Sequence, residues 1–412
     1  MDMRFFDAAN DEDTSMLNRA MVLGFNDGEP SKKQLDRITE LVVSGNSVMT
    51  GVYDDGSPDA EYAKMPVGTF VAAHGTVNLG SGPRPAEMIT SVTVRPTSKR
   101  HGILREMMTA NLTRMRGEGA KLALLTATSA GIYGRFGFCD VVDWGPISIL
   151  EPRRFELKCE PSGRVEMVGL EWLFPQIPGL FQKFHEHTRG SVERIDGYYA
   201  VEMKLLGDDG NVDPKFRGAV HLNEAGGIDG YLVYWIEKGT HLRVVDLITM
   251  NHNAEFAFWD FMTSIELIED ITWEFAPADW LLPRALTDRR VVKRQTIDDG
   301  LWARVLDPSI LVDRTYVIDG SFDFMVDDPM GLITGAYTLS VRQGVCEVKE
   351  YVGDVAHLPL VSVQALGALL FASETVWDLQ DLGMIEGIMP RDIDRVNMLF
   401  SPPCRPRFAT MF

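Results

Sequence analysis

One stretch constrains this chain most: a strand-like run that passes through a basic turn straight into an amphipathic helix. The run ends at Val94, the turn reads RPTSKRHG, and apolar residues then recur at helical spacing from Ile103 to Met115. A helix start of this kind exposes backbone N–H groups that suit an anion, and Gly102 lets a ligand approach the backbone closely. The turn therefore predicts a pyrophosphate cradle, and a solvated surface helix is the alternative. Its positive charges are Lys99, Arg100 and Arg105.

The length and charge of the chain limit its partners. At 412 residues it is longer than one hydrophobic core usually supports, so two or three domains are expected. The formal net charge of −19 makes nucleic acid a poor partner, because no basic field is present to displace counterions. The same charge suits a cationic substrate, although acidity also serves solubility alone.

The cysteines and the N-terminus bear on the compartment. The four cysteines contain no CxxC pair, which favours reduced thiols over disulfides or a zinc site. The first residues, MDMRFFDAANDEDTS, lack the apolar core and basic start of a signal peptide. No apolar run approaches the ~20 residues of a membrane-spanning helix. We therefore expect a cytoplasmic protein without a membrane span.

Residues 1–150 alternate helix and strand patterns, which predicts a mixed α/β domain. Ser31 followed by Gln34 forms a capping-box pattern at the start of a helix. The run KLALLTATS at 121–129 is almost wholly apolar at its start and predicts a buried strand. The segment GIYGRFGF at 131–138 then predicts a short turn or helix.

Two further units follow along the chain. Residues 151–297 predict a second α/β unit, with strands at 198–206, 218–224, 230–239 and 241–250 and a helix at 253–268. Its last strand–helix step faintly repeats the strand–helix step of the first unit, without glycine or Lys/Arg at the turn. Chance similarity of two αβ units is the alternative. Residues 298–412 predict a third unit of strands and helices, with a helical or helix–turn–helix segment at 362–383 and a further short helix at 390–401. Its final segment, PPCRPRFATMF, is unusually apolar, which indicates a docked tail.

Two motifs together carry a family resemblance. The loop KRHGIL at 99–104 and the segment GIYGRFGF resemble the acyl-CoA-dependent acetyltransferases of the GNAT superfamily, whose signature is (Q/R)xxGx(G/A). Lys99 and Leu104 depart from that signature. Over nearly its whole length the chain resembles the Eis (enhanced intracellular survival) family of aminoglycoside acetyltransferases. That resemblance implies tandem GNAT-type domains, the second without a cofactor loop, followed by a sterol-carrier-protein-like domain.

The resemblance also implies acetyl-CoA as co-substrate and assigns residues to it. The pantetheine arm would meet a splayed strand, and the pyrophosphate would meet the amides of the basic loop. Thr128 and Ser129 match a further contact position, although both also suit helix capping. The implied strand residues are Val92, Thr93 and Val94, and the implied loop residues are Arg100, His101, Gly102, Ile103, Leu104 and Arg105.

Two residues match the catalytic positions of the family. Tyr133 matches the general acid: a phenol with a pKa near ~10 can protonate a departing thiolate of pKa ~8.5 and stay protonated itself at neutral pH. Aromatic packing is the alternative role for Tyr133. The family also places the carboxylate of its last residue, here Phe412, in the active site as the base. An α-carboxyl with a pKa of ~3.5 is a poor base in water, so burial or a relaying water would have to assist it.

The acceptor is implied to be a cationic amine such as an aminoglycoside. Asp27 matches an acidic substrate-contact position, with Glu29 as a weaker candidate and a solvated loop as the alternative. Lysine acetylation on proteins and lipid binding with a vestigial acyltransferase site remain rival functions. The family assembles as a homohexamer, a dimer of trimers. His185 and His187 are spaced by two residues and lack a carboxylate–histidine pattern, so we expect no metal site.

Overall fold

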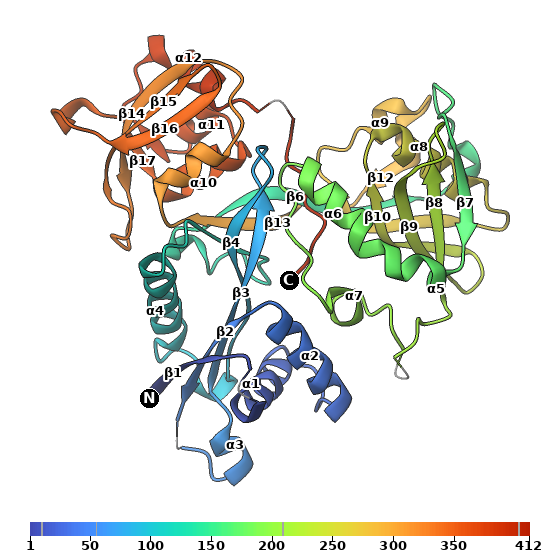
Figure 1. Ribbon diagram of the computed structural model, residues 1–412, viewed down its shortest axis with the longest axis horizontal. Coiled ribbons are helices and arrows are strands. Elements are labelled where there is room, and N and C mark those ends of the chain that lie inside the picture. Colours follow the sequence, from blue (N-terminus) through green and yellow to red (C-terminus); the bar gives the residue numbers. More distant parts are fainter. Residues whose placement is uncertain (10, 55, 208–209, 403) are drawn as a thin grey trace.

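The computed structural model describes residues 1–9, 11–54, 56–207, 210–402 and 404–412. Figure 1 shows three lobes that follow one another along the chain, with the C-terminus lying between the first two. A 13-stranded sheet runs through the first two lobes in the order β1-β2-β3-β4-β5-β13-β6-β11-β10-β9-β8-β7, with β12 paired to β6. A separate 5-stranded sheet, ordered β16-β15-β14-β17-β18, forms the third lobe.

The first lobe holds the strand–turn–helix step that the sequence emphasises. Helix α4 buries Ile103, Met107, Met108, Leu112 and Met115 against the sheet, which is the predicted apolar stripe. Ser31 and Gln34 form the predicted capping box of α2. The elements are β1 (Asp2–Asp7), α1 (Asp11–Gly24), α2 (Lys32–Ser44), β2 (Val48–Tyr53), α3 (Ala60–Lys64), β3 (Gly68–Asn78), β4 (Pro83–Val94), α4 (Ile103–Gly117), β5 (Leu122–Leu125) and β6 (Cys139–Ile149).

The second lobe repeats this α/β arrangement. The predicted strands at 218–224, 230–239 and 241–250 correspond to β8, β9 and β10, and the predicted helix at 253–268 corresponds to α8. The elements are β7 (Arg164–Val168), α5 (Leu170–Leu173), α6 (Ile177–His187), α7 (Tyr198–Val201), β8 (Phe216–Leu222), β9 (Ile228–Glu237), β10 (His241–Thr249), α8 (His252–Ser264), β11 (Asp270–Pro277), α9 (Leu282–Ala285) and β12 (Val292–Arg294).

The strand predicted at 198–206 is wrong, because the segment begins as the short helix α7. Gly197 enters this helix with φ +86°, and the neighbouring residues Tyr198 and Tyr199 are both buried. Two successive buried side chains suit a helical turn, whereas a strand sends them to opposite faces. Packing therefore overrides the β-rich local composition.

The third lobe packs helices on its own small sheet. The predicted helix–turn–helix at 362–383 becomes α10 and α11, and the predicted helix after Pro390 becomes α12. The elements are β14 (Gly320–Asp327), β15 (Gly335–Arg342), β16 (Val345–Glu350), β17 (Leu360–Ser362), α10 (Val363–Phe371), α11 (Val376–Asp381), β18 (Ile385–Glu386) and α12 (Pro390–Phe400).

Strand β13 (Asp298–Val305) joins the lobes. It lies antiparallel between β5 and β6 and hydrogen-bonds to both, so it completes the large sheet. The predicted boundary between residues 297 and 298 falls immediately before this strand. Arg304 of β13 forms a fully buried ion pair of 2.7 Å with Asp328, which follows β14. We retain three units as a proposal, with β13 assigned to the large sheet by its hydrogen bonds.

Candidate active site

Strands β4 and β5 separate within the sheet and leave an open V. They pair in parallel only where Glu87–Ile89 faces Ala123–Leu125. Strand β5 ends at Leu125, whereas β4 continues to Val94 without a β5 partner. Ser91, at φ +56°, lies where the β3–β4 register shifts, so a bulge bends β4 here. In the part of the chain that the structure describes, the backbone of β4 beyond Ile89 therefore has no pairing with β5, which leaves room for a ligand on that side.

The three predicted strand residues lie along this open edge. Val92 and Val94 are half-buried and pack against the apolar cluster beneath α4. Thr93 is buried, and its hydroxyl lies 2.6 Å from the hydroxyl of Thr69. A Cβ at Gly24 would lie 2.5 Å from the Thr93 hydroxyl, so the end of α1 covers Thr93 directly.

The basic loop presents the N-terminus of α4 to the same opening. Arg100 and Gly102 both adopt left-handed conformations, at φ +68° and +84°. No side chain caps the helix, and the first amides of a helix lack helical acceptors. Leu104 is half-buried in the apolar cluster, so this departure from the signature packs inward rather than crowding the loop. The exposed loop residues are Arg100, His101, Gly102 and Arg105, and Ile103 is buried.

Tyr133 lies at the start of the 3₁₀ turn Gly134–Phe136 and is only 6% exposed. Its ring packs edge-on against Phe138 at 6.2 Å, and burial raises the pKa of its phenol. The third lobe fixes this turn, since Gln364 Nε2 of α10 donates a 2.9 Å hydrogen bond to the carbonyl of Gly134. Gly137 has φ +82°, and a Cβ there would lie 2.7 Å from Arg304 Nε.

Thr128 and Ser129 are exposed just beyond the end of β5. The carbonyl of Ser129 accepts the amide of Ile132 at 3.3 Å. The 3₁₀ turn that follows has no side-chain cap, so the capping alternative for these two residues finds no support there.

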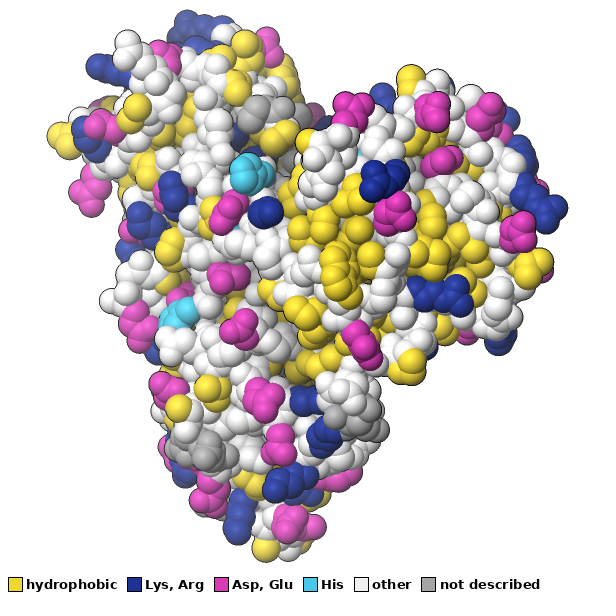
Figure 2. All heavy atoms as spheres, turned by 45° about the vertical axis from the view of Figure 1, so that its right-hand side comes forward, with side chains coloured by type: hydrophobic (Ala, Val, Ile, Leu, Met, Phe, Trp, Pro, Cys, Tyr) yellow, Lys and Arg dark blue, Asp and Glu magenta, His cyan; other side chains and the backbone are white. Residues whose placement is uncertain are grey.

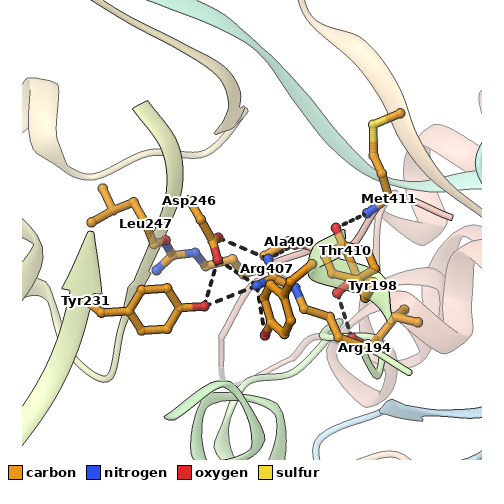
Figure 3. Close-up of polar contacts among 11 residues, drawn as sticks. Arg194, Tyr198, Tyr231, Asp246, Leu247, Arg407, Ala409, Thr410 and Met411 are labelled. Carbon is orange, nitrogen blue, oxygen red and sulfur yellow. Dashed lines mark hydrogen bonds and ion pairs between the residues drawn. The ribbon is translucent and has the colours of Figure 1, made fainter. Parts of the chain in front are cut away.

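The C-terminal tail, residues 404–412, runs back along the second lobe to the open V. Figure 3 shows its polar contacts: Thr410 donates to the carbonyl of Val192 at 2.8 Å, and the amide of Met411 donates to the hydroxyl of Tyr198 at 3.1 Å. Phe408 stacks on Trp144 at 5.1 Å. These contacts confirm that the apolar tail is docked.

A buried ion pair anchors the tail. Arg194 forms two hydrogen bonds to Asp246, of 2.7 and 3.0 Å, and also donates to the carbonyl of Ala409 (Figure 3). Its guanidinium lies 4.0 Å from the ring centre of Phe181, and Tyr231 donates to Asp246 at 2.7 Å. The Coulombic attraction of Asp246 holds the pKa of Arg194 well above its usual value despite burial, which lowers it.

The last residue reaches the end of β5. Thr126, directly after Leu125, donates a 2.5 Å hydrogen bond through Oγ1 to the main-chain oxygen of Phe412. The Phe412 side chain is half-buried against the core that spans the first and third lobes. The structure thus brings the main-chain oxygen of Phe412 to the segment that leads from β5 to Tyr133.

The second lobe contains a similar V that the tail partly fills. Strands β10 and β11 pair in parallel only over 241–244 and 270–273, and β10 continues to Thr249. Arg407 of the tail donates to the carbonyl of Leu247 at 3.3 Å and to the hydroxyl of Thr249 at 3.5 Å. The side chain of Asn251 accepts the amide of Ala254 and caps α8. In the second lobe, Arg407 and Asn251 therefore occupy the positions that the V of the first lobe leaves open. A cavity of about 610 Å³ adjoins this second V.

The surface beside the tail is apolar and hollowed. A cavity of about 370 Å³ there is lined by Trp144, Trp273, Phe275 and Met411, among others. Figure 2 shows apolar side chains gathered on this side of the molecule, with acidic and basic residues around them.

The predicted acidic substrate contacts, Asp27 and Glu29, lie in the loop after α1, the helix whose end contacts Thr93 of β4. Asp27 is exposed in the loop between α1 and α2, three residues after Gly24, which touches Thr93. Glu29 instead pairs with Arg19, which also contacts Glu61 at 3.2 Å. Asp27 therefore remains the free carboxylate of the two.

The paired histidines have separate surroundings. His185 is buried, with its ring nitrogens at 2.8 Å from the Thr76 hydroxyl and 3.1 Å from the Ser191 hydroxyl, whereas His187 is exposed. Within the described ranges, no group of three or more His, Cys, Asp or Glu residues is placed to hold a metal ion. Nor does any described helix have the length and apolarity needed to cross a bilayer.

Sequence reasoning did not find four of these residues: Thr126, Arg194, Asp246 and Gln364. Arg194 and Asp246 are 52 positions apart, and no local pattern links them. Thr126 had a signal, since a hydroxyl at the end of a buried strand next to the Tyr133 segment is a candidate for the site. Gln364 had none, because its partner is a backbone carbonyl in another lobe.

Comparison with known proteins agrees with this architecture. Models of GNAT acetyltransferase domains match residues 6–140 and 190–305, and a sterol carrier protein domain model matches residues 308–409. An uncharacterized N-acetyltransferase of Streptomyces griseus is 30% identical over 356 residues, which cover 81% of this chain and 83% of the relative. N-acetyltransferase Eis of Mycobacterium tuberculosis is 27% identical over 276 residues, covering 63% and 64% of the two chains.

Solved structures share the whole fold. Eis1 from Mycobacterium abscessus superposes with a TM-score of 0.81 over all of both chains at 24% identity. A probable N-acyltransferase from Enterococcus faecalis gives the same TM-score at 16% identity, again over both full chains. The fold and the open V define a GNAT-type N-acetyltransferase with a sterol-carrier-like third domain. The chain belongs to the GNAT N-acetyltransferases and is similar to N-acetyltransferase Eis among them, and the predicted fold class is confirmed.

Proposed function

We propose that this enzyme transfers the acetyl group of acetyl-CoA to an amine of a cationic small molecule, with aminoglycosides as the substrate class that the family resemblance suggests. The observation that carries the proposal is the hydrogen bond from Thr126 to the main-chain oxygen of Phe412. This hydrogen bond would hold the Phe412 carboxylate at one side of the open V. Its donor, Thr126, lies on the segment that also carries the buried Tyr133.

The proposed cofactor contacts follow from the shape of the V. The free backbone of β4 at Val92, Thr93 and Val94 would bind the pantetheine amides. The uncapped amides at the start of α4, with Arg100 and Arg105 beside them, would bind the pyrophosphate. Thr128 and Ser129, exposed beyond β5, face solvent where they can contact the same arm.

The proposed reaction needs one base and one acid. The Phe412 carboxylate accepts a proton from the acceptor ammonium, directly or through a water, and the free amine attacks the thioester carbonyl carbon. The nitrogen, now bonded to the carbonyl carbon, gives up its second proton to solvent. The carbon–sulfur bond breaks, and Tyr133 protonates the departing thiolate. Burial supports this role of Tyr133, because its raised pKa keeps the phenol protonated at neutral pH. The proton that Phe412 accepted then passes through solvent to the Tyr133 phenolate, which restores both groups.

Release of free CoA thiol in the presence of acetyl-CoA and a panel of amines tests this function. We expect thiol release with aminoglycosides or other polycationic amines, and slower release with lysine peptides. Release only with lysine peptides would favour protein acetylation. No release with any amine would contradict the proposed function.

The assembly is part of the proposal. We propose the homohexamer that the family resemblance implies, a dimer of trimers. Light scattering on the purified chain distinguishes it directly from a monomer or a single trimer.

A further inference from the structure

The turn that carries Tyr133 has little in its own sequence to hold it in place. It contains Gly131, Gly134 and Gly137, and glycine restricts the backbone less than any other residue. Among the residues that the structure describes, none outside the immediate neighbours has an atom within 4 Å of a Cβ added at Gly131 or Gly134. The position of the Tyr133 phenol therefore depends on what packs against the turn from elsewhere in the chain.

Helix α10 of the third lobe packs against this segment, on the side of the lobe that faces the first lobe (Figure 1). A Cβ added at Gly137 of the turn would lie 2.8 Å from Val363 Cγ1 of α10. A Cβ added at Gly367 of the same helix would lie 2.8 Å from Cys139 Sγ, at the start of β6. The helix and the segment thus meet at both points without room for one more carbon atom.

Gln364 is the one polar residue of α10, whose sequence is VQALGALLF. Every other residue of the helix is buried, whereas Gln364 is half-buried. Its Nε2 donates a 2.9 Å hydrogen bond to the carbonyl of Gly134, the residue directly after Tyr133. The same carbonyl accepts the amide of Gly137 at 3.0 Å, which closes the 3₁₀ turn. A carbonyl oxygen has two lone pairs, so Gln364 supplies its second donor.

We propose that Gln364 is a positioning residue, whose hydrogen bond to Gly134 holds the turn so that the Tyr133 phenol meets the departing thiolate. The inference rests on the proposed role of Tyr133 as the general acid. It gives the third lobe a part in the reaction besides supplying the C-terminal tail.

The role predicts a particular kinetic effect. A proton is transferred efficiently only when the donor and the acceptor are within hydrogen-bond reach, so a small displacement of the turn lowers the rate of the chemical step. Gln364 acts on the thiolate only through Tyr133. Loss of its hydrogen bond should therefore lower kcat and leave both KM values nearly unchanged.

Steady-state kinetics by thiol release measures this effect. Gln364→Met keeps the length of the side chain and removes its donor. We expect it to lower kcat about tenfold, with each KM within about threefold of the parent. The matched control is Gln176→Met, because Gln176 Nε2 also donates a 2.9 Å hydrogen bond to a backbone carbonyl, that of Trp172 in the second lobe. This control should leave kcat and both KM values unchanged.

Two further readouts separate positioning from a general loss of structure. In a Tyr133→Phe background, Gln364→Met should lower kcat no further, because the acid that Gln364 positions is absent. Hydrogen exchange, followed by mass spectrometry on the full chain, examines the turn without turnover. A peptide that contains residues 131–138 should exchange at least about fivefold faster in Gln364→Met than in the parent, the effect of losing one hydrogen bond. Gln176→Met should leave this exchange unchanged.

The outcomes distinguish this inference from the proposed function. An unchanged kcat in Gln364→Met would overturn the inference, as would an equal fall in kcat in the Tyr133→Phe background or unchanged exchange over 131–138. If Gln364→Met does not fold, Gln364→Asn takes its place, since it keeps the amide and shortens the side chain by one methylene. No thiol release from the parent with any amine would contradict the proposed function, and the exchange measurement would still decide whether Gln364 holds the turn.

Discussion

The hydroxyl of Thr126 donates a 2.5 Å hydrogen bond to the main-chain oxygen of Phe412, a residue 286 positions further along the chain. This contact joins the end of a central strand of the first lobe to the end of the chain that leaves the third lobe. The tail crosses the second lobe on its way, held by Arg194 and Arg407. All three lobes therefore contribute to one site.

Replacement of Thr126 by Val should lower kcat/KM for acetyl transfer about tenfold, because the carboxylate loses a hydrogen bond worth about 1.5 kcal/mol. Valine keeps the shape of threonine and removes only the donor. Steady-state kinetics by thiol release measures the change. Thr126→Ser retains the hydroxyl and should recover most of the activity. A Val variant as active as the parent would show that the hydrogen bond does not position the carboxylate.

Replacement of Tyr133 by Phe should lower kcat by at least about a hundredfold, the usual size of a general-acid contribution. The ring packing against Phe138 is preserved, so stability should change little. Burial raises the pKa of the Tyr133 phenol, so the alkaline decline of the parent, which reports ionisation of the phenol, should come at a higher pH than for a solvent-exposed tyrosine.

The pH profile provides the control for Tyr133. The residual rate of the Phe variant should lack the alkaline decline, because no phenol remains to ionise. An unchanged kcat, or an identical alkaline decline in both proteins, would assign Tyr133 to packing alone.

Gly137→Ala should destabilise the protein by about 2 kcal/mol or more, through the left-handed backbone and overpacking together. The added Cβ would lie 2.7 Å from Arg304 Nε and 2.8 Å from Val363 Cγ1. Gly134→Ala is the matched control, since nothing lies within 4 Å of its Cβ. Urea unfolding compares the two. Equal stabilities would mean that the turn and the third lobe are not tightly fitted at Gly137.

Asp246→Asn should lower the free energy of unfolding by about 3 kcal/mol, because it leaves the buried Arg194 without its counter-charge. Since Arg194 also holds the carbonyl of Ala409, kcat should fall as the tail loosens. Calorimetric unfolding and thiol release measure the two effects. Asp260→Asn, on the exposed face of α8, should shift stability by no more than about 0.5 kcal/mol. An Asp246 variant with unchanged stability but lower kcat would show that Asp246 holds the tail without stabilising the fold. Lower stability with unchanged kcat would show the opposite.

Local patterns predicted the elements that depend on neighbours in sequence. The apolar spacing from Ile103 to Met115 identified α4, and the Ser31–Gln34 pair identified the start of α2. The apolar composition of the last residues predicted that the tail is docked. In each case the signal and the structure involve the same few residues.

Long-range pairing could not be predicted. Strand β13 enters the sheet between β5 and β6, and hydrogen bonds across so large a sequence separation leave no local pattern. The strand predicted at 198–206 failed for a similar reason, since α7 is fixed by the packing of Tyr198 and Tyr199 around Arg194. The sequence shows a hydroxyl at Thr126, after a buried strand, but does not show that its partner is Phe412, 286 positions away.

Adding one glycine after Phe412 tests the central claim most directly, because it moves the terminal carboxylate by one residue and changes no side chain. We predict that kcat/KM falls at least about a hundredfold while the unfolding midpoint stays near that of the parent. Activity within about twofold of the parent would show that the terminal carboxylate is not the catalytic base.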